Sequence, residues 1–186
     1  MPPSTDEPYV PVNLMIPGSI WYQLVYRQRR SSPFVVQDIP EFTYHYADRP
    51  AALLSILGPV RGSFGTAGLP KMFAKLLSGR RAFYCVTHHD RIASFGWAMK
   101  SWCRYYWVGQ GEVVIGPTIT DPEFRGRGLA TYALKKAVNS LMENGHSVFY
   151  IDTSNDNAAA QRMIAKCDFG TPVAVYLRAY ERGELK

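Results

Sequence analysis

The sequence has few cysteines and no long apolar segment. Its 186 residues include only three cysteines, Cys85, Cys103 and Cys167, and no two of them have the spacing of a metal-binding pair. An odd and sparse set of cysteines fits a reducing compartment better than a disulfide-linked framework. The first residues lack the basic and apolar regions of a signal peptide, and no apolar run reaches the roughly 18 residues of a membrane span. We therefore expect a cytoplasmic protein without a membrane span.

Acidic residues are also in the minority, since 15 Asp and Glu face 21 Lys and Arg and leave a net charge of +6. A basic surface favours anionic partners such as phosphate groups. The basic cluster at residues 27–30 is most often a solvated surface, and no nucleic-acid-reading motif accompanies it, so we expect no nucleic-acid partner. A hydrophobic content of 47% and this length predict a single globular domain over residues 1–186.

Glycine is informative at one place, where a predicted strand meets a predicted helix. Residues 113–120 are apolar and β-branched, as in a buried strand, and Pro122 cannot continue a sheet. From residue 129 to 142 apolar side chains recur at helical spacing. Between them, Arg125-Gly126-Arg127-Gly128 places small and positively charged residues at a helix N-terminus, whose free N–H groups bind anions. This pattern predicts a pyrophosphate-binding site.

Two better-known glycine motifs do not fit this stretch. A dinucleotide-binding fingerprint needs a third glycine after Gly128, and the next residues are Leu129, Ala130 and Thr131. A Walker loop needs Gly-Lys followed by Ser or Thr, which is absent here. An ordinary glycine-rich strand–helix turn is the remaining alternative.

With its preceding strand and turn, Arg125-x-x-Gly128-x-Ala130 resembles the acyl-CoA-binding motif of the GNAT superfamily of N-acyltransferases. A second segment, from Asn157 through Ala160 to Phe169, is similar to the second motif of that superfamily. Two positions depart from it. Asp168 replaces the usual glycine, and Ile164 stands where many members carry a tyrosine that protonates the thiolate. The resemblance covers residues 80–180 well and the first eighty residues poorly.

The resemblance implies an α/β fold of the α+β type, with a mixed, mostly antiparallel central sheet flanked by helices. The strands at residues 113–120 and 147–151 would run parallel and splay apart. It also implies acetyl-CoA, or another acyl-CoA, as co-substrate, without a metal. The implied cofactor-binding residues are Thr118, Ile119, Thr120, Arg125, Gly126, Arg127, Gly128, Leu129, Ala130, Thr131, Asn157 and Ala160.

The implied reaction is transfer of the acyl group to an amine of a small molecule or sugar, which can be anionic, by direct attack in a ternary complex. No paired cysteine and histidine is recognisable, so we do not favour an acyl-enzyme. Acylation of a protein N-terminus or lysine is an alternative, as is a non-catalytic acyl-CoA sensor or partner-binding module. The sequence also leaves a homodimer open.

Glu112 is the candidate general base. It shares strand parity with Val114, Gly116, Thr118 and Thr120, which places its carboxylate on the side of the expected cleft. A carboxylate there can take the proton of the attacking ammonium, directly or through water. A surface glutamate at the start of a strand is an equally good interpretation.

The remaining segments carry weaker patterns. Residues 1–33 predict an irregular N-terminal arm, although residues 20–26 are strand-like. We further expect helices over 50–57 and 70–77 with a loop over 58–68, a hairpin of 81–87 with 92–99, an extension of this meander over 102–108, a helix end at Gly145, and a last strand over 173–178. Only eight residues follow that strand, so the last hairpin of the superfamily would be short.

Overall fold

The computed structural model describes residues 22–103 and 105–177. The strands are β1 Tyr22–Arg29, β2 Phe42–Ala47, β3 Arg81–His88, β4 Arg91–Lys100, β5 Val113–Thr120, β6 Val148–Ser154 and β7 Ala174–Leu177. The helices are α1 Pro50–Leu54, α2 Leu57–Leu77, α3 Leu129–Glu143 and α4 Ala158–Ala165, and a 3-10 turn, η1, covers Pro122–Phe124.

These strands form one sheet in the order β2-β3-β4-β5-β6-β1-β7. Within it β5 and β6 are parallel, and the other neighbouring strands of the described part are antiparallel. The expected mixed, mostly antiparallel sheet with a parallel pair is therefore confirmed.

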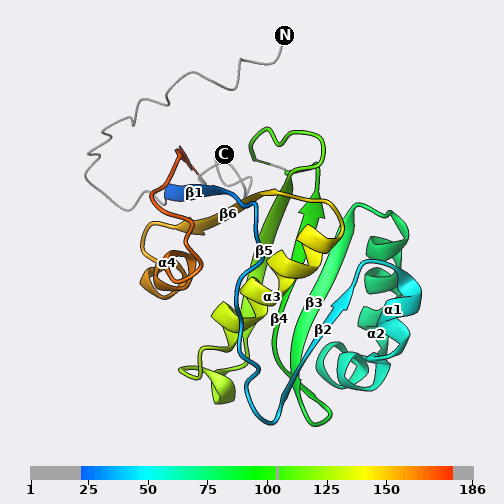
Figure 1. Ribbon diagram of the computed structural model, residues 1–186. Coiled ribbons are helices and arrows are strands. Elements are labelled where there is room, and N and C mark those ends of the chain that lie inside the picture. Colours follow the sequence, from blue (N-terminus) through cyan, green and yellow to red (C-terminus); the bar gives the residue numbers. More distant parts are fainter. Residues whose placement is uncertain (1–21, 104, 178–186) are drawn as a thin grey trace, which may run out of the picture.

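Helices cover both faces of the sheet (Figure 1). Side chains of α3 pack with Tyr84 and Val86 of β3 in one core, whereas α1 and α2 pack with Phe83 and Cys85 in another. Successive residues of β3 thus point to opposite faces, as the two-residue period of a strand requires. Because both faces are covered, β3 has no polar side between Ala82 and Val86, which explains the continuous apolar sequence of these residues.

The N-terminal segment is not irregular throughout. Residues 22–29 form β1, which lies between β6 and β7 and is antiparallel to both. Val25 and Tyr26 are buried there, so the strand-like pattern noted at residues 20–26 is confirmed for the part that the structure describes. Residues 1–21 lie outside the described residues. Residues 178–186, on which the expected short last hairpin depends, also lie outside the described residues.

The loop predicted over residues 58–68 is wrong. Helix α2 begins at Leu57 and runs to Leu77, with a single break at Gly65, whose φ is 68° and ψ 168°. Pro59 lies in the first turn, where a backbone N–H has no helical partner to lose; the first helical hydrogen bond is donated by Val60. Burial of Val60 and Met72 against the sheet outweighs the weak helix propensity of the glycines.

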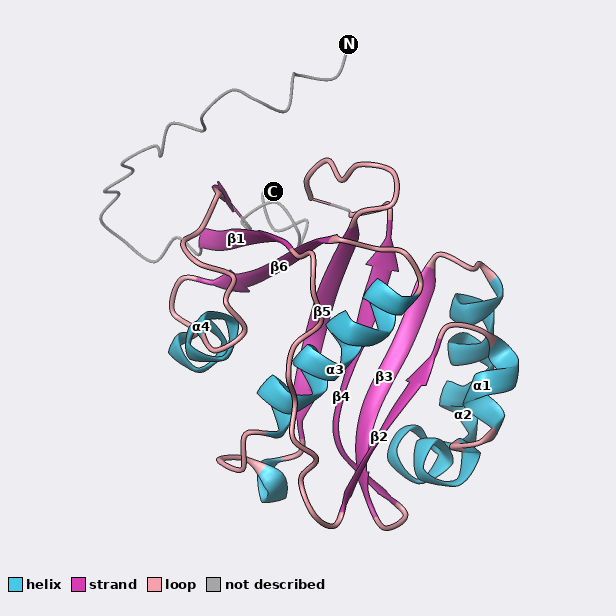
Figure 2. Ribbon diagram, in the orientation of Figure 1, coloured by secondary structure: helices cyan, strands magenta, loops and turns pink. Residues whose placement is uncertain are grey.

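Residues 102–108 do not extend the meander. In their described part they belong to the connection that joins the end of β4 to the start of β5 (Figure 2). By contrast, the predicted left-handed helix end is confirmed, since Gly145 has a φ of 84° and His146 N–H donates to Leu141 O. Asp168 also adopts the left-handed conformation, with a φ of 58°.

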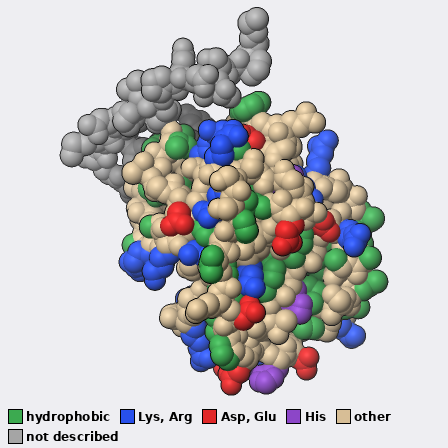
Figure 3. Space-filling view, viewed as in Figure 1, with side chains coloured by type: hydrophobic (Ala, Val, Ile, Leu, Met, Phe, Trp, Pro, Cys, Tyr) green, Lys and Arg blue, Asp and Glu red, His purple; other side chains and the backbone are tan. Residues whose placement is uncertain are grey.

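The surface seen in Figure 3 carries Lys and Arg side chains interspersed with Asp and Glu side chains. On this face the basic side chains do not gather into one patch. Within the described residues, no helix has the length and apolar character needed to cross a membrane.

Candidate active site

The parallel strands β5 and β6 stay together for only two residue pairs, Val113 with Phe149 and Val114 with Tyr150. Beyond these pairs β6 and β1 turn away from the direction of β5 (Figure 2). Strand β5 has an irregularity at this point. Gly96 of β4 pairs with Thr118 but Ala98 pairs with Ile115, so β5 holds one residue more than β4 over this interval. Such a bulge bends a strand and interrupts its pairing, and the expected splay is confirmed.

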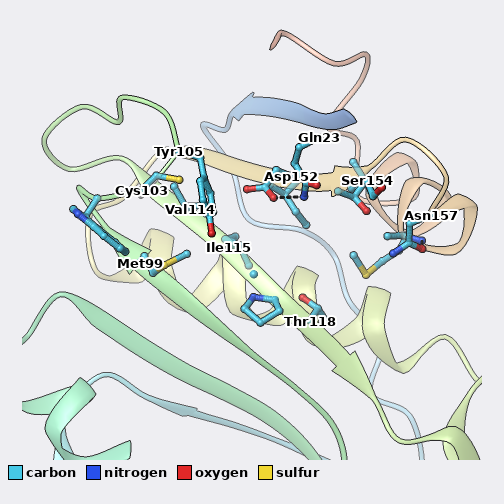
Figure 4. A pocket seen from close by; sticks show the side chains of 18 residues that line it. Gln23, Met99, Cys103, Tyr105, Val114, Ile115, Thr118, Asp152, Ser154 and Asn157 are labelled. Atoms are coloured by element: carbon cyan, nitrogen blue, oxygen red, sulfur yellow. Dashed lines mark hydrogen bonds between the residues drawn. The ribbon is translucent and has the colours of Figure 1, made fainter. Parts of the chain in front are cut away.

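A cavity of about 450 Å³ lies between the two strands where they separate. Figure 4 shows Gln23 and Asp152 on one side of it, with Met99, Cys103 and Tyr105 on the other. Its lining residues come from β1, β4, β5, β6, α4 and the connection after β4: Gln23, Met99, Trp102, Cys103, Tyr105, Val114, Ile115, Gly116, Pro117, Thr118, Ile151, Asp152, Thr153, Ser154, Asn157, Ala160, Met163 and Ile164.

The residues that line the cavity come from both faces of the sheet. Ile151 of β6 and Ile164 of α4 belong to the core on the α3 face. Asp152 follows Ile151 in the strand, so its side chain points to the opposite face. Met99 points to this same face, because its neighbour Ala98 belongs to the core on the α3 face. The cavity therefore has one end beside α4 and a second end beneath the connection from β4 to β5.

The predicted pyrophosphate site lies at the start of α3. Gly126 and Gly128 both have left-handed backbones, with φ of 79° and 76°, and an added Cβ at either would meet no atom within 4 Å. Gly128 is the N-cap of α3, and Tyr132 N–H makes the first hydrogen bond back to its carbonyl. The N–H groups at residues 129–131 are therefore free of helical partners. The site thus offers open space and donors to an anion.

The sequence-predicted residues fall into two groups in space. Thr118, Asn157 and Ala160 line the cavity. Residues 119–120 and 125–131 do not line it, but they follow Thr118 along the chain from the end of β5 to the first turn of α3. Asn157 caps α4 by accepting a hydrogen bond from Ala160 N–H at 3.0 Å. Binding of acyl-CoA by these residues stays a prediction.

Asp152 is the one charged residue among the 18 that line the cavity. Its Oδ1 accepts a hydrogen bond from Gln23 Nε2 at 2.6 Å, and its Oδ2 accepts one from the hydroxyl of Tyr106 at 3.0 Å. Burial raises the pKa of Tyr106, and the negative charge of Asp152 raises it further, so the phenol remains a donor. Two fixed donors thus hold the carboxylate in place at the cavity wall.

Sequence reasoning missed Asp152 and its two donors. A polar residue at the end of a buried strand beside a predicted splay is a signal for Asp152. No local pattern marks Gln23, which lies 129 positions away from its partner. Tyr106 lies in the stretch that was expected to extend the meander.

Glu112 lies just before β5 and does not line the cavity. Its Oε2 accepts hydrogen bonds from Gly109 N–H at 2.8 Å and from the Tyr150 hydroxyl at 3.0 Å. Its Oε1 forms an ion pair with Arg27 at 3.2 Å. Burial alone would raise the pKa of this carboxyl, but the three donors outweigh burial and lower it. These contacts hold the connection after β4 against the sheet; the role of proton acceptor stays a prediction.

Comparison with known proteins identifies the family of this arrangement. Residues 50–169 match the model of the acetyltransferase (GNAT) family. The chain belongs to this family. The matched segment spans α1 to the end of α4 and so contains both motifs noted in the sequence. Strands β1, β2 and β7 of this GNAT chain lie outside it.

Several solved GNAT structures share its fold. A tandem GNAT protein from the clavulanic acid biosynthesis pathway is 15% identical, with a TM-score of 0.62 over 86% of this chain and 53% of the other. This chain thus spans about half the length of the tandem protein. The aminoglycoside N-acetyltransferase AAC(6')-Iy in complex with CoA is 16% identical, with a TM-score of 0.55 over 74% of this chain and 93% of the other. A GNAT-family acetyltransferase from Colwellia psychrerythraea is 16% identical, with a TM-score of 0.52 over 86% of this chain and 55% of the other. A comparison with curated proteins found no match.

Proposed function

We propose that this GNAT chain transfers an acetyl group from acetyl-CoA to a primary amine by direct attack within a ternary complex. The supporting observation is the cavity between β5 and β6, which passes from the face of α3 and α4 to the opposite face. A cavity with two ends can receive a thioester from one side and an amine from the other. Family membership supports the acetyl donor.

The residues present fit the phosphate-bearing donor. Its pyrophosphate would accept hydrogen bonds from the free N–H groups at residues 129–131, with Arg125 and Arg127 supplying positive charge. Its pantetheine arm would follow residues 118–120 and pass Asn157 and Ala160 into the cavity. Beyond Val114, β6 no longer pairs with β5, so backbone N–H groups of β5 are available to polarise the thioester carbonyl.

The amine would enter at the end that contains Asp152. Its carboxylate attracts an ammonium group, and its fixed orientation holds the nitrogen near the thioester. After loss of a proton, the nitrogen forms a bond to the carbonyl carbon while the carbon–sulfur bond breaks. The proton lost before the attack goes to a carboxylate or to water. The nitrogen loses a second proton as it becomes an amide, and this proton ends on the thiolate, directly or through water. Ile164, which lines the cavity, has no proton to supply.

Two carboxylates compete for the role of proton acceptor. Glu112 is the residue that the sequence predicts, and it lies on the same face of the sheet as Tyr150. Asp152 reaches the cavity, whereas Glu112 does not. Geometry therefore supports Asp152 as the residue that contacts the amine. The variants Asp152→Asn and Glu112→Gln separate the two assignments.

The function is tested by two measurements on the full chain. Titration calorimetry with CoA measures binding of the donor, and thiol release from acetyl-CoA in the presence of an amine panel measures transfer. We expect CoA binding and amine-dependent thiol release. Binding without release from any small amine or peptide would indicate a sensor, and release with peptides alone would indicate a protein acetyltransferase. Absence of CoA binding at millimolar concentration, with the protein folded, would overturn the proposal.

A further inference from the structure

A second hollow lies next to the cavity on the face covered by α2. It has a volume of about 460 Å³ and is formed by the C-terminal end of α2, the start of β3 and the end of β4. Its lining residues are Ala74, Lys75, Ser78, Arg80, Arg81, Met99 and Trp102. Met99 and Trp102 also line the cavity. The two spaces therefore meet across these two side chains.

The hollow is strongly basic. Three of its lining residues, Lys75, Arg80 and Arg81, are cations, and none of its lining residues is acidic. Ion pairs in the described part of the chain involve other basic residues, so these three have no carboxylate partner there. A cluster of like charges without a counter-ion favours an anion.

Aromatic rings hold two of these cations beside the hollow. Lys75 Nζ lies 4.6 Å from the centre of the Trp97 ring, and the Arg81 guanidinium lies 5.8 Å from that of Trp102. Such contacts attract a cation without neutralising its charge. Burial, followed by repulsion from Arg81 and Lys71, lowers the pKa of Lys75. An anion bound here would relieve this repulsion.

Charge is thus separated across two adjacent spaces that share Met99 and Trp102 in their walls. At the inner end Asp152 is the one charged residue, and at the outer end the charged residues are Lys75, Arg80 and Arg81. The apolar side chains of Met99 and Trp102 lie between the two ends. A molecule that matches this pattern carries an ammonium group, an apolar middle and an anionic group.

We propose that the acceptor is an amine that also carries an anionic group, with its ammonium toward Asp152 and its anion at Lys75, Arg80 and Arg81. This inference rests on the proposed function, because it places the acceptor in the same cavity. It also specifies what the cavity rejects. A polycationic acceptor would bring positive charge to the basic hollow, and like charges in proximity disfavour binding.

The test compares acceptors that differ only at the end distant from the amine. Hexylamine carries an ammonium alone, 6-aminohexanoate adds a carboxylate, and the phosphate ester of 6-aminohexanol adds a phosphate. We expect KM for at least one of the two anionic amines to be ten times lower than for hexylamine, or more. The tighter of the two identifies the anionic group. Equal or lower KM for hexylamine than for both would overturn the inference.

Charge-removing variants test the location. In Arg81→Gln and Lys75→Gln, KM for the preferred anionic amine should rise about tenfold, whereas KM for hexylamine should stay unchanged. The matched control is Lys71→Gln, because Lys71 is exposed on the same helix and does not line the hollow. If Lys71→Gln raised KM for the anionic amine equally, the effect would come from the overall positive charge of the surface, and a specific site would be contradicted. An unchanged KM in Arg81→Gln and Lys75→Gln would overturn the location of the anion in the basic hollow.

Calorimetry separates failure of this inference from failure of the proposed function. The same three amines are titrated into the protein with and without CoA present. If CoA binds but the anionic amines bind no better than hexylamine, the inference fails and the donor site stands. If CoA does not bind, preferential binding of an anionic amine, lost in Arg81→Gln, still supports the basic hollow while the acetyltransferase proposal fails.

Discussion

Tyr84 reaches across Gly96 and places its hydroxyl 2.7 Å from the hydroxyl of Thr118. The three residues stand in line on β3, β4 and β5, since Tyr84 pairs with Gly96 and Gly96 pairs with Thr118. A Cβ at Gly96 would lie 2.2 Å from the Tyr84 hydroxyl. Only glycine therefore leaves room for this contact, and through it a residue of the α3 core supports the cavity-lining end of β5.

Gly96→Ala should disturb both the fold and donor binding. Tyr84 is fully buried and cannot swing aside, so the new methyl group should cost about 1–3 kcal/mol of unfolding free energy, as overpacked cores do. Displacement of Thr118 should also weaken CoA binding. Chemical denaturation and calorimetry measure the two effects. Gly62→Ala is the control, because Gly62 is an exposed residue of α2 with no atom within 4 Å of its Cβ position; it should be neutral or slightly stabilising. Unchanged stability of Gly96→Ala would place the tyrosine ring elsewhere.

Gly128→Ala should weaken CoA binding by tenfold or more, equivalent to about 1.4 kcal/mol. A methyl group there blocks the close approach of a phosphate to the N-terminus of α3. The left-handed backbone also makes any side chain destabilising, so loss of stability alone proves nothing. Gly145→Ala is the matched control, because Gly145 has a similar φ of 84° at the opposite end of the same helix. It should lose comparable stability and keep full CoA affinity, and an equal affinity loss in both variants would contradict a phosphate site at Gly128.

Asp152→Asn and Glu112→Gln should separate amine binding from proton transfer. If Asp152 holds the ammonium, its variant should raise the amine KM by on the order of tenfold while CoA affinity is unchanged. If Glu112 accepts the proton, its variant should lower kcat about 10²–10⁴-fold, with partial recovery at higher pH as more amine is neutral. Wild-type turnover of Glu112→Gln at every pH would leave Glu112 with its structural contacts alone. Glu143→Gln, at an exposed position on α3, controls for the loss of one negative charge.

Stability should depend on pH through Glu112. Burial opposes its charge, but hydrogen bonds from Gly109, Tyr150 and Arg27 together lower its pKa in the folded protein. A lowered folded-state pKa stabilises the fold above the unfolded pKa of about 4.3, and this stabilisation disappears as pH falls through the folded-state value. The difference in unfolding free energy between wild type and Glu112→Gln should therefore be constant near neutral pH and shrink in acid. A pH-independent difference in urea denaturation would contradict this linkage.

The predictions that the structure and the family comparison confirm were based on local sequence patterns. Strand β5 and helix α3 follow from runs of neighbouring residues whose spacing suits one conformation. The left-handed Gly145 follows from its place after the last helical residue. The prediction of a loop over residues 58–68 was wrong because the helix propensity of single residues is a weak determinant of structure. Burial of α2 against the sheet outweighed the low helix propensity of the glycines.

Family membership and the glycine-rich turn before α3 were determined by the sequence alone, because each depends on residues that are close together in the chain. The insertion of β1 between β6 and β7 was decided only by the tertiary structure. The tertiary structure alone also decided the hydrogen bonds that Gln23 and Tyr106 donate to Asp152. It likewise decided that the cavity containing Asp152 and the basic hollow share Met99 and Trp102 as lining residues. The physical reason is that these contacts join residues distant in sequence, and their energies arise only after the sheet has assembled.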